Sequence, residues 1–329
     1  MSGFDVIGDI HGHASKLEDR LLGLGYTIGP DTGAYRHSDR RAVFVGDLID
    51  RGPEQLRVLE IVKAMVDSGS ALIVMGNHEF NAIAYATADP ERPGEYRRPH
   101  SDKNTAQHRA FLEQLTESQR TYYIEWFMTL PLWLELDGLR VVHACWHEPS
   151  RAVVRTALGG ERFTTAEQIV SATDKSSPLY EAVEVLLKGP EVSLVDYGLP
   201  AYRDKDGHRR EKARARWWHQ GATTLPELAE VGSFRTEDGD PYPPLPSIQV
   251  DPADRSYVYN DRLPVFYGHY WRTDNPVHLD DWTDYTACVD FSAGKGGTLV
   301  AYRWSGEPTI ALEHYVPHGA DVVAQTPAD

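Results

Sequence analysis

Short apolar runs alternate with amphipathic stretches over the first 80 residues. Runs rich in β-branched residues around Val6-Ile7, at 42–46 and at 71–75 predict three buried strands. Between them, Leu17 to Leu24 and Leu56 to Val66 place apolar residues at near-helical spacing and predict two helices. Strands that alternate with helices build a parallel sheet with crossover helices. The pattern therefore predicts an α/β fold that begins β-α-β-α-β.

The pattern from residue 88 to 144 predicts a loop, a helix and a hairpin. Residues 88–103 hold three prolines and no apolar period, which is typical of a loop. Thr116 and Gln119 match a capping box, so we expect a helix that Pro131 ends. Apolar alternation on both sides of Asp137-Gly138 predicts a β-hairpin.

Periodicity is weakest from residue 149 to 262, where we expect one helix at about 178–187 and a stiff proline-rich connection. We interpret 149–262 as an insertion or cap region within one domain that spans 1–329. Strand periodicity resumes at Val265. Residues 286–291 and 298–303 predict a second antiparallel pair.

Composition narrows the class of protein. The formal charge of −16 argues against an extended nucleic-acid surface or a membrane surface, because such surfaces carry clustered Lys and Arg. Only Cys145 and Cys288 are cysteines, and without a CxxC pattern they fit a reducing compartment. No run reaches the length of a membrane span, and the first strand leaves no room for a targeting segment. We therefore expect a cytoplasmic protein without a membrane partner, and the oligomeric state stays open.

Five apolar runs lead into side chains that can bind a metal ion. The candidate ligands are Asp9, His11, Asp47, Asn77, His143 and His269. Each follows a predicted strand, and open α/β sheets place their chemistry at such strand ends. Oxygen and imidazole ligands without cysteine exclude a thiolate zinc finger and favour a two-metal hydrolytic centre.

These motifs resemble a known family. Gly8-Asp-Ile-His-Gly12, Gly46-Asp-Leu-Ile-Asp-Arg-Gly52, Gly76-Asn-His-Glu79, His143 and Gly268-His269 resemble, in order and spacing, the signature of calcineurin-like metallophosphoesterases. The Asp-Arg-Gly and Asn-His-Glu extensions look like the phosphoprotein phosphatase branch, which includes bacterial serine/threonine phosphatases and diadenosine tetraphosphate hydrolases. The resemblance covers 4–147 well and 263–303 moderately. It implies a four-layer α-β-β-α sandwich with a dinuclear metal site at the strand C-terminal ends.

The resemblance also implies roles. Asp9, His11 and Asp47 would hold a first metal, and Asp47 would bridge to a second metal held by Asn77, His143 and His269. His78 would protonate the leaving oxygen and Asp50 would orient His78, while Arg51 and Asn77 would contact the phosphate. This ligand set suits two divalent ions, with Mn²⁺ favoured over Fe or Zn. The sequence departs from the family where Ala-Cys-Trp follows His143 and where Tyr270 follows His269.

The family usually adds a second phosphate-binding arginine. Arg214 and Arg216, within the basic run 204–218, are the candidates, and Trp217 or Trp218 behind them could stack on a base. The other interpretation of this run is a solvated charge run followed by tryptophans that pack in the core.

The predicted function is hydrolysis of phosphate monoesters, on a phosphoprotein or a small phosphorylated substrate. Two metal ions would lower the pKa of a shared water and create the attacking hydroxide. The alternatives are a diadenosine polyphosphate or nucleic-acid-end phosphohydrolase, and a non-catalytic binding module on the same fold. A phosphodiester nuclease is a further, less favoured reading.

Overall fold

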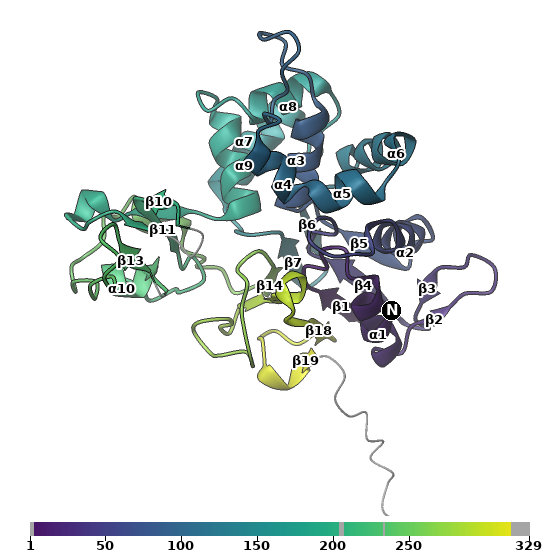
Figure 1. Cartoon of the computed structure of the whole chain (residues 1–329). Coiled ribbons are helices and arrows are strands. Elements are labelled where there is room, and N and C mark those ends of the chain that lie inside the picture. The colour runs from purple at the N-terminus through teal and green to yellow at the C-terminus, as the bar shows by residue number, and fades with distance from the viewer. Residues whose placement is uncertain (1–2, 204–206, 233, 317–329) are drawn as a thin grey trace, which may run out of the picture.

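The computed structural model describes residues 3–203, 207–232 and 234–316 (Figure 1). Its helices are α1 (Ala14–Gly23), α2 (Gln55–Asp67), α3 (Asn77–Ala86), α4 (Asp102–Gln107), α5 (Arg109–Gln114), α6 (Glu117–Met128), α7 (Glu148–Leu158), α8 (Ala166–Ala172), α9 (Pro178–Lys188) and α10 (Leu225–Leu228), with 3₁₀ turns η1 (Val195–Tyr197), η2 (Asp254–Tyr257), η3 (Ala293–Lys295) and η4 (Leu312–His314).

The first large sheet has the strand order β19-β18-β1-β4-β5. Its strands are β1 (Gly3–Ile7), β4 (Arg40–Phe44), β5 (Ala71–Ile73), β18 (Ala301–Trp304) and β19 (Tyr315–Val316). β1, β4 and β5 run parallel with α1 and α2 as crossovers, which confirms the predicted β-α-β-α-β start. A small hairpin, β2 (Thr27–Ile28) and β3 (Tyr35–Arg36), projects from the α1–β4 connection.

The second large sheet has the order β15-β14-β7-β6. It consists of β6 (Trp133–Leu136), β7 (Leu139–Val142), β14 (Val265–Tyr267) and β15 (Thr286–Cys288). β6 and β7 form the predicted hairpin around Asp137-Gly138, and the Thr116–Gln119 capping box starts α6 as expected. β14 lies parallel to β7, so the late strand joins the hairpin across more than 120 residues of intervening chain.

The two sheets pack face to face. Val6 and Val43 from the first sheet share one apolar cluster with Val141 and Phe266 from the second. Alternate residues point outward, so Ile7 and Phe44 pack with the α1 and α2 side chains. On the outer face of the second sheet, Tyr267 packs with Leu186 of α9 and with Trp217. These residues belong to the same apolar cluster as Ile7 and Phe44. This is the predicted α-β-β-α sandwich.

One predicted pairing is confirmed only in part. Residues 286–291 and 298–303 do not form one antiparallel ribbon, because only β16 (Asp290–Phe291) and β17 (Thr298–Leu299) pair. β15 instead pairs with β14, and β18 pairs with β1. Between β15 and β18 the chain crosses from the second sheet to the first, so these two strands belong to different sheets.

The region 149–262 contains more regular structure than its weak periodicity suggested. α9 coincides with the predicted helix, but α7 and α8 precede it, and α7 packs on α9. The described residues between 191 and 250 (191–203, 207–232 and 234–250), called here the side lobe, lie to the left in Figure 1. The side lobe is built from β8 (Glu191–Ser193), β9 (Tyr202–Arg203), β10 (Arg209–Arg210), β11 (Lys212–Ala215), α10, β12 (Ala229–Glu230) and β13 (Arg235–Thr236), around a separate apolar cluster.

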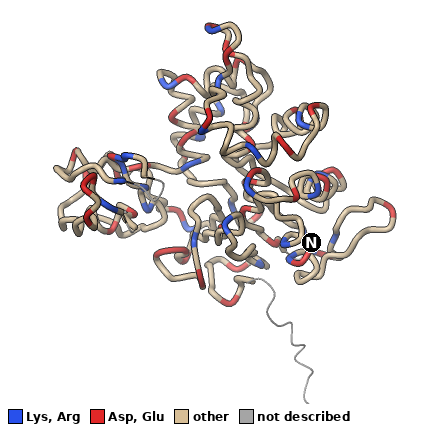
Figure 2. Tube along the Cα trace, in the orientation of Figure 1, with Lys and Arg blue, Asp and Glu red and all other residues tan. Residues whose placement is uncertain are grey.

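Charged residues of both signs are interspersed along the trace in every part of the molecule (Figure 2). Within the described ranges, no helix combines the length and the apolar character needed to cross a membrane.

Candidate metal centre

The six predicted ligands lie at the ends of strands from both sheets. Asp9 and His11 follow β1, Asp47 follows β4, and Asn77 begins α3 after β5. His143 follows β7 and His269 follows β14. All six side chains are buried, with exposed fractions of at most 8%. The structure therefore brings the residues of all five motifs to one edge of the sandwich.

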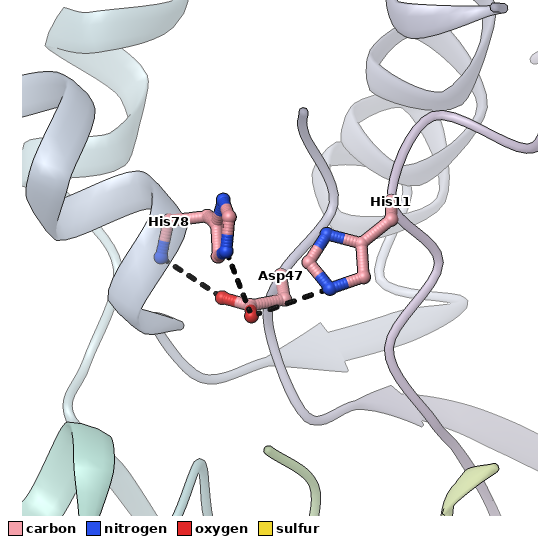
Figure 3. A group of neighbouring side chains, drawn as sticks. All are labelled: His11, Asp47 and His78. Carbon is pink, nitrogen blue, oxygen red and sulfur yellow. Dashed lines mark hydrogen bonds and ion pairs between the residues drawn. The ribbon is translucent and has the colours of Figure 1, made fainter. Parts of the chain in front are cut away.

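Asp47 lies between His11 and His78 (Figure 3) and also close to His143. Its Oδ2 is 3.6 Å from His11 Nε2 and 3.8 Å from His78 Nε2, and its Oδ1 is 3.4 Å from His143 Nε2. Donor atoms of His11, Asp47 and His78 lie within 4.8 Å of one another, and so do those of Asp47, His143 and His269. Asp47 is common to both groups, which is the position that a bridging carboxylate needs.

Asn77 joins the second group through its carbonyl. Asn77 Oδ1 lies 3.0 Å from His143 Nε2 and 2.8 Å from His269 Nδ1. His143 Nδ1 donates to the Val45 carbonyl at 2.7 Å, so in the neutral ring Nε2 carries a lone pair directed at Asn77 and Asp47. Acceptor atoms that point at one another need a cation or a proton between them.

The first group also fits a cation. His11 Nδ1 donates to the Ile49 carbonyl at 2.9 Å, which leaves the Nε2 lone pair facing Asp47. His11 Nε2 and Asp9 Oδ1 are buried and have no hydrogen-bond partner among the described residues. Buried polar atoms are rarely left without a partner. Oxygen and imidazole donors of this kind suit a divalent transition metal.

The electrostatics match a site built for positive charge. Burial raises the pKa of Asp9 well above its ordinary value, with the charges of Asp290 and Asp47 adding to it. Burial lowers the pKa of His143, but the Asp47 carboxylate outweighs it and raises that pKa to about 10. Burial lowers the pKa of His11 to about 3, and His78 contributes further. Several carboxylates in one buried place repel one another unless cations lie among them.

The backbone at the site is strained. His11, Asp47, Asp50, Arg51 and His269 have φ values of 47°, 50°, 70°, 69° and 73°, in the left-handed region that most residues avoid. Such conformations cluster at functional sites, where the surrounding structure holds them in place. At Gly268 a Cβ would lie 2.0 Å from Asp9 Oδ1, which explains the glycine before His269.

Asp50 and His78 form a hydrogen-bonded pair, and sequence reasoning missed its third member. His78 Nδ1 lies 2.5 Å from Asp50 Oδ2, and His108 Nδ1 lies 2.8 Å from Asp50 Oδ1. Burial raises the pKa of Asp50, but the hydrogen bonds from His108 and His78 outweigh it and lower the pKa to about 2. His108 lies between α4 and α5 and belongs to no motif, so the sequence carries no signal for it.

Glu79 is a second residue whose role the sequence did not indicate. Its carboxylate accepts hydrogen bonds from the backbone N–H groups of Asp47, Leu48 and Gly76, at 2.8, 2.8 and 3.0 Å. Burial, with the charge of Asp47, raises the pKa of Glu79 to about 7. Glu79 ties the Asp47 loop to the start of α3, and its place in the Asn-His-Glu motif was the available signal.

The predicted phosphate-binding arginines occupy different places. The exposed Arg51 has its guanidinium carbon 4.3 Å from the centre of the Trp271 ring. Arg214, on β11 of the side lobe, reaches the site, where its Nη2 lies 3.3 Å from His269 Nε2. Arg216 instead lies 3.7 Å from Asp280.

The two tryptophans that follow Arg216 are core residues. Trp217 and Trp218 are buried, and both rings pack on Tyr267. Base stacking by either ring is therefore excluded, and the core interpretation of these tryptophans is correct.

Comparison with known proteins defines the class. Residues 3–198 match the calcineurin-like phosphoesterase family, and the chain belongs to this family. A solved serine/threonine phosphatase from Saccharomyces cerevisiae, with similarity to human PP5, has the same fold: it covers 97% of this chain and 80% of its own, with a TM-score of 0.52 and 13% identity.

Particular relatives are more similar in sequence. A protein of Oceanobacillus iheyensis named bis(5'-nucleosyl)-tetraphosphatase PrpE (asymmetrical) is 33% identical over 143 residues, 43% of this chain and 54% of that protein. The Bacillus subtilis protein of the same name is 34% identical over 148 residues, 43% of this chain and 57% of its own. The chain thus spans about half the length of the curated relatives it matches.

Proposed function

We propose that this protein hydrolyses phosphate monoesters with the help of two divalent metal ions. The observation that carries the proposal is that Asp47 belongs to two groups of neighbouring donor atoms, with lone pairs of His11 and His143 directed inward. We assign Asp9, His11 and Asp47 to one ion, and Asp47, Asn77, His143 and His269 to the other. Mn²⁺ is the ion we favour, with Fe and Zn as alternatives. When bound, such ions lower the pKa of a water molecule and neutralise phosphate charge.

The phosphate-binding groups come from three elements. Asn77 lies at the N-terminus of α3, where the dipole of the helix favours an anion. The charge of Arg51 acts on His11, and Arg214 Nη2 lies 3.3 Å from His269 Nε2. Planar guanidinium groups can each donate two parallel hydrogen bonds to phosphate oxygens. We assign substrate binding to Arg51, Asn77 and Arg214. We do not assign it to Arg216, because the Arg216 guanidinium lies 3.7 Å from the Asp280 carboxylate.

His78 is the proton donor in this proposal. Burial lowers the pKa of His78, but the carboxylates of Asp47 and Asp50 outweigh it and raise the pKa above the ordinary value, which favours the protonated ring that a proton donor needs. Asp50 orients the ring through Nδ1, which leaves Nε2 to donate to the leaving oxygen. His108 holds the other oxygen of Asp50 and is a positioning residue for the pair.

We infer that residues 149–262 act as a cap within a single domain, since this region delivers Arg214 to the site. A cytoplasmic location is part of the same proposal. A second candidate function is hydrolysis of dinucleoside polyphosphates, and the observation that favours it is the name of the two bacterial relatives.

The test is a panel of substrates with added Mn²⁺. Wild type should hydrolyse 4-nitrophenyl phosphate, and the Asp47→Asn variant should lose at least about 100-fold in kcat. Four further substrates then distinguish the hypotheses. A phosphopeptide tests monoester hydrolysis, and diadenosine tetraphosphate tests polyphosphate hydrolysis. A 5'-phosphorylated oligonucleotide tests activity on nucleic-acid ends, and bis(4-nitrophenyl) phosphate tests diester hydrolysis. Activity no higher than that of the Asp47→Asn variant on every substrate would leave a binding module as the better account.

A further inference from the structure

Three arginines of the 88–103 loop lie in different electrostatic settings. Arg92 and Arg97 both pair with Asp89, at 2.8 and 3.1 Å. Arg98 is half-buried, and within the described ranges no carboxylate lies within 4.0 Å of its guanidinium. Arg98 Nη1 donates to Asn81 Oδ1 at 3.0 Å, and Nη2 donates to Gln107 Oε1 at 2.8 Å. The cation of Arg98 is thus held in place by neutral amides.

Those two amides place Arg98 on the side of the site that holds the proton donor. Asn81 lies three residues after His78 on α3, so both side chains lie on the same face of the helix. Gln107 directly precedes His108 in the chain. His78 and His108 both bind Asp50, and the charge of Asp50 acts on Arg98, so Arg98 lies near the hydrogen-bonded group that serves the leaving oxygen.

The surroundings compensate the charge of Arg98 only partly. Burial lowers the pKa of Arg98, whereas Asp50 and Glu184 at longer range raise it. Asp50 already accepts from two imidazoles, and Glu184 lies 2.5 Å from Lys188 Nζ on the same helix. A half-buried cation without an adjacent counter-ion costs free energy unless an anion binds to it.

We propose that Arg98 binds a second phosphate group, the one carried by the leaving group, so that this chain prefers phosphoanhydrides to isolated monoesters. The inference rests on the proposed function and names a substrate class for the same site. In the reaction, a water oxygen bonds to the terminal phosphorus and the water gives a proton to solvent. The bond from phosphorus to the bridging oxygen breaks, and His78 protonates that oxygen, which leaves as the shorter polyphosphate.

A phosphate fits the position of Arg98 better than a carboxylate of a peptide does. In a polyphosphate the second charged group follows directly after the bridging oxygen. In a phosphopeptide the nearest acidic side chain is at least one residue further on, about 3.5 Å of extended chain away. An acidic phosphopeptide is therefore included in the test as the competing outcome.

The experiment compares inorganic tripolyphosphate with 4-nitrophenyl phosphate in the presence of Mn²⁺. Arg98→Gln should lower kcat/KM for tripolyphosphate by about 10- to 100-fold, the effect of losing a hydrogen bond to a charged group. The loss with 4-nitrophenyl phosphate should stay under about threefold, and Arg98→Lys should recover part of the tripolyphosphate activity. Arg92→Gln is the matched control, because it removes a loop arginine that already pairs with Asp89.

The remaining outcomes decide against the inference. Equal losses on both substrates, with a lowered thermal unfolding midpoint, would mean that Arg98 only joins α3 to α4. A loss confined to an acidic phosphopeptide would assign Arg98 to peptide recognition. Wild type that hydrolyses 4-nitrophenyl phosphate but not tripolyphosphate overturns the inference and leaves the proposed function intact, whereas wild type that hydrolyses neither overturns both.

Discussion

At the scale of single residues, Asp50 is held between two imidazoles. One carboxylate oxygen faces His78, the proposed proton donor, and the other faces His108. His108 is itself held by stacking on Phe111, with ring centroids 4.8 Å apart. The orientation of His78 therefore depends on a residue that does not touch the substrate in the proposed mechanism.

We predict that loss of the His108 hydrogen bond weakens catalysis most where the leaving group needs a proton. His108→Leu should lower kcat about 10-fold with phenyl phosphate, because general acid catalysis matters most for a basic leaving group. With 4-nitrophenyl phosphate, whose leaving group needs less help, the loss should be much smaller. His108→Asn keeps a donor near Nδ1 and serves as the control. A loss that is the same for both esters would reduce His108 to a structural role.

The depressed pKa of Asp50 predicts a pH-dependent contribution to stability. With a folded pKa of about 2 against an ordinary 3.8, the carboxylate stabilises the folded state by about 2 kcal/mol above pH 4. That contribution is lost as pH falls through 2. Urea unfolding of wild type and Asp50→Asn without added metal should therefore show a difference that is constant from pH 6 to pH 5 and shrinks toward pH 3. A difference independent of pH would contradict the assignment.

At the scale of elements, α3 organises the site. It begins with Asn77 and His78, and Glu79 in its first turn binds three backbone N–H groups of two loops. The backbone of Asp47 is strained, with a φ of 50°. The hydrogen bonds to Glu79 hold Asp47 in this conformation.

Replacement of Glu79 should therefore cost stability. In Glu79→Gln an NH₂ group replaces one carboxylate oxygen, so at least one backbone N–H group loses its acceptor. The substitution should lower the free energy of unfolding by about 2 to 3 kcal/mol. Chemical denaturation measures this loss, and Mn²⁺ affinity should fall with it because Asp47 is no longer fixed. Glu117→Gln, which changes an exposed first-turn acid of α6, is the control and should have little effect. Equal stability of the two variants would refute the role given to Glu79.

The elements that carry the motifs could be predicted from the sequence, because each of the five strands has an apolar run before its ligand and four of them also have a glycine directly before it. The pairing of late strands could not. Val265 to Tyr267 lie parallel to β7, and β18 inserts beside β1, through contacts that no local pattern encodes. For the same reason His108 and Arg98 escaped prediction: their roles depend on where α4 and the loop before it pack against α3.

At the scale of the whole molecule, the side lobe supplies a cation to a site in a protein of charge −16. Arg214 on β11 pairs in register with Glu230 on β12. Arg272, three residues after His269, forms an ion pair with Glu230, and its Nε lies 3.2 Å from Asp281. Arg272 therefore connects the side lobe to the segment that carries a proposed metal ligand.

We predict that Arg272→Met loosens the position of Arg214. Removal of one partner of a largely buried ion pair leaves Glu230 without its cation. KM for 4-nitrophenyl phosphate should rise about 3- to 10-fold while kcat falls less, and limited proteolysis should cut faster within 191–250. Arg235→Met, at an exposed position on β13 of the same lobe, should change neither quantity. An unchanged KM in Arg272→Met would mean that the position of the side lobe does not affect substrate binding.

Binding of Mn²⁺ to the metal-free protein, followed by isothermal titration calorimetry and checked by elemental analysis, tests the central claim most directly. Wild type should bind two ions per chain. Asp47→Asn, which replaces the carboxylate common to both groups by a neutral amide with a single oxygen, should not hold two ions. A wild-type chain that binds no divalent transition metal, or an Asp47→Asn variant that binds two ions as tightly as wild type, would contradict the shared-carboxylate site.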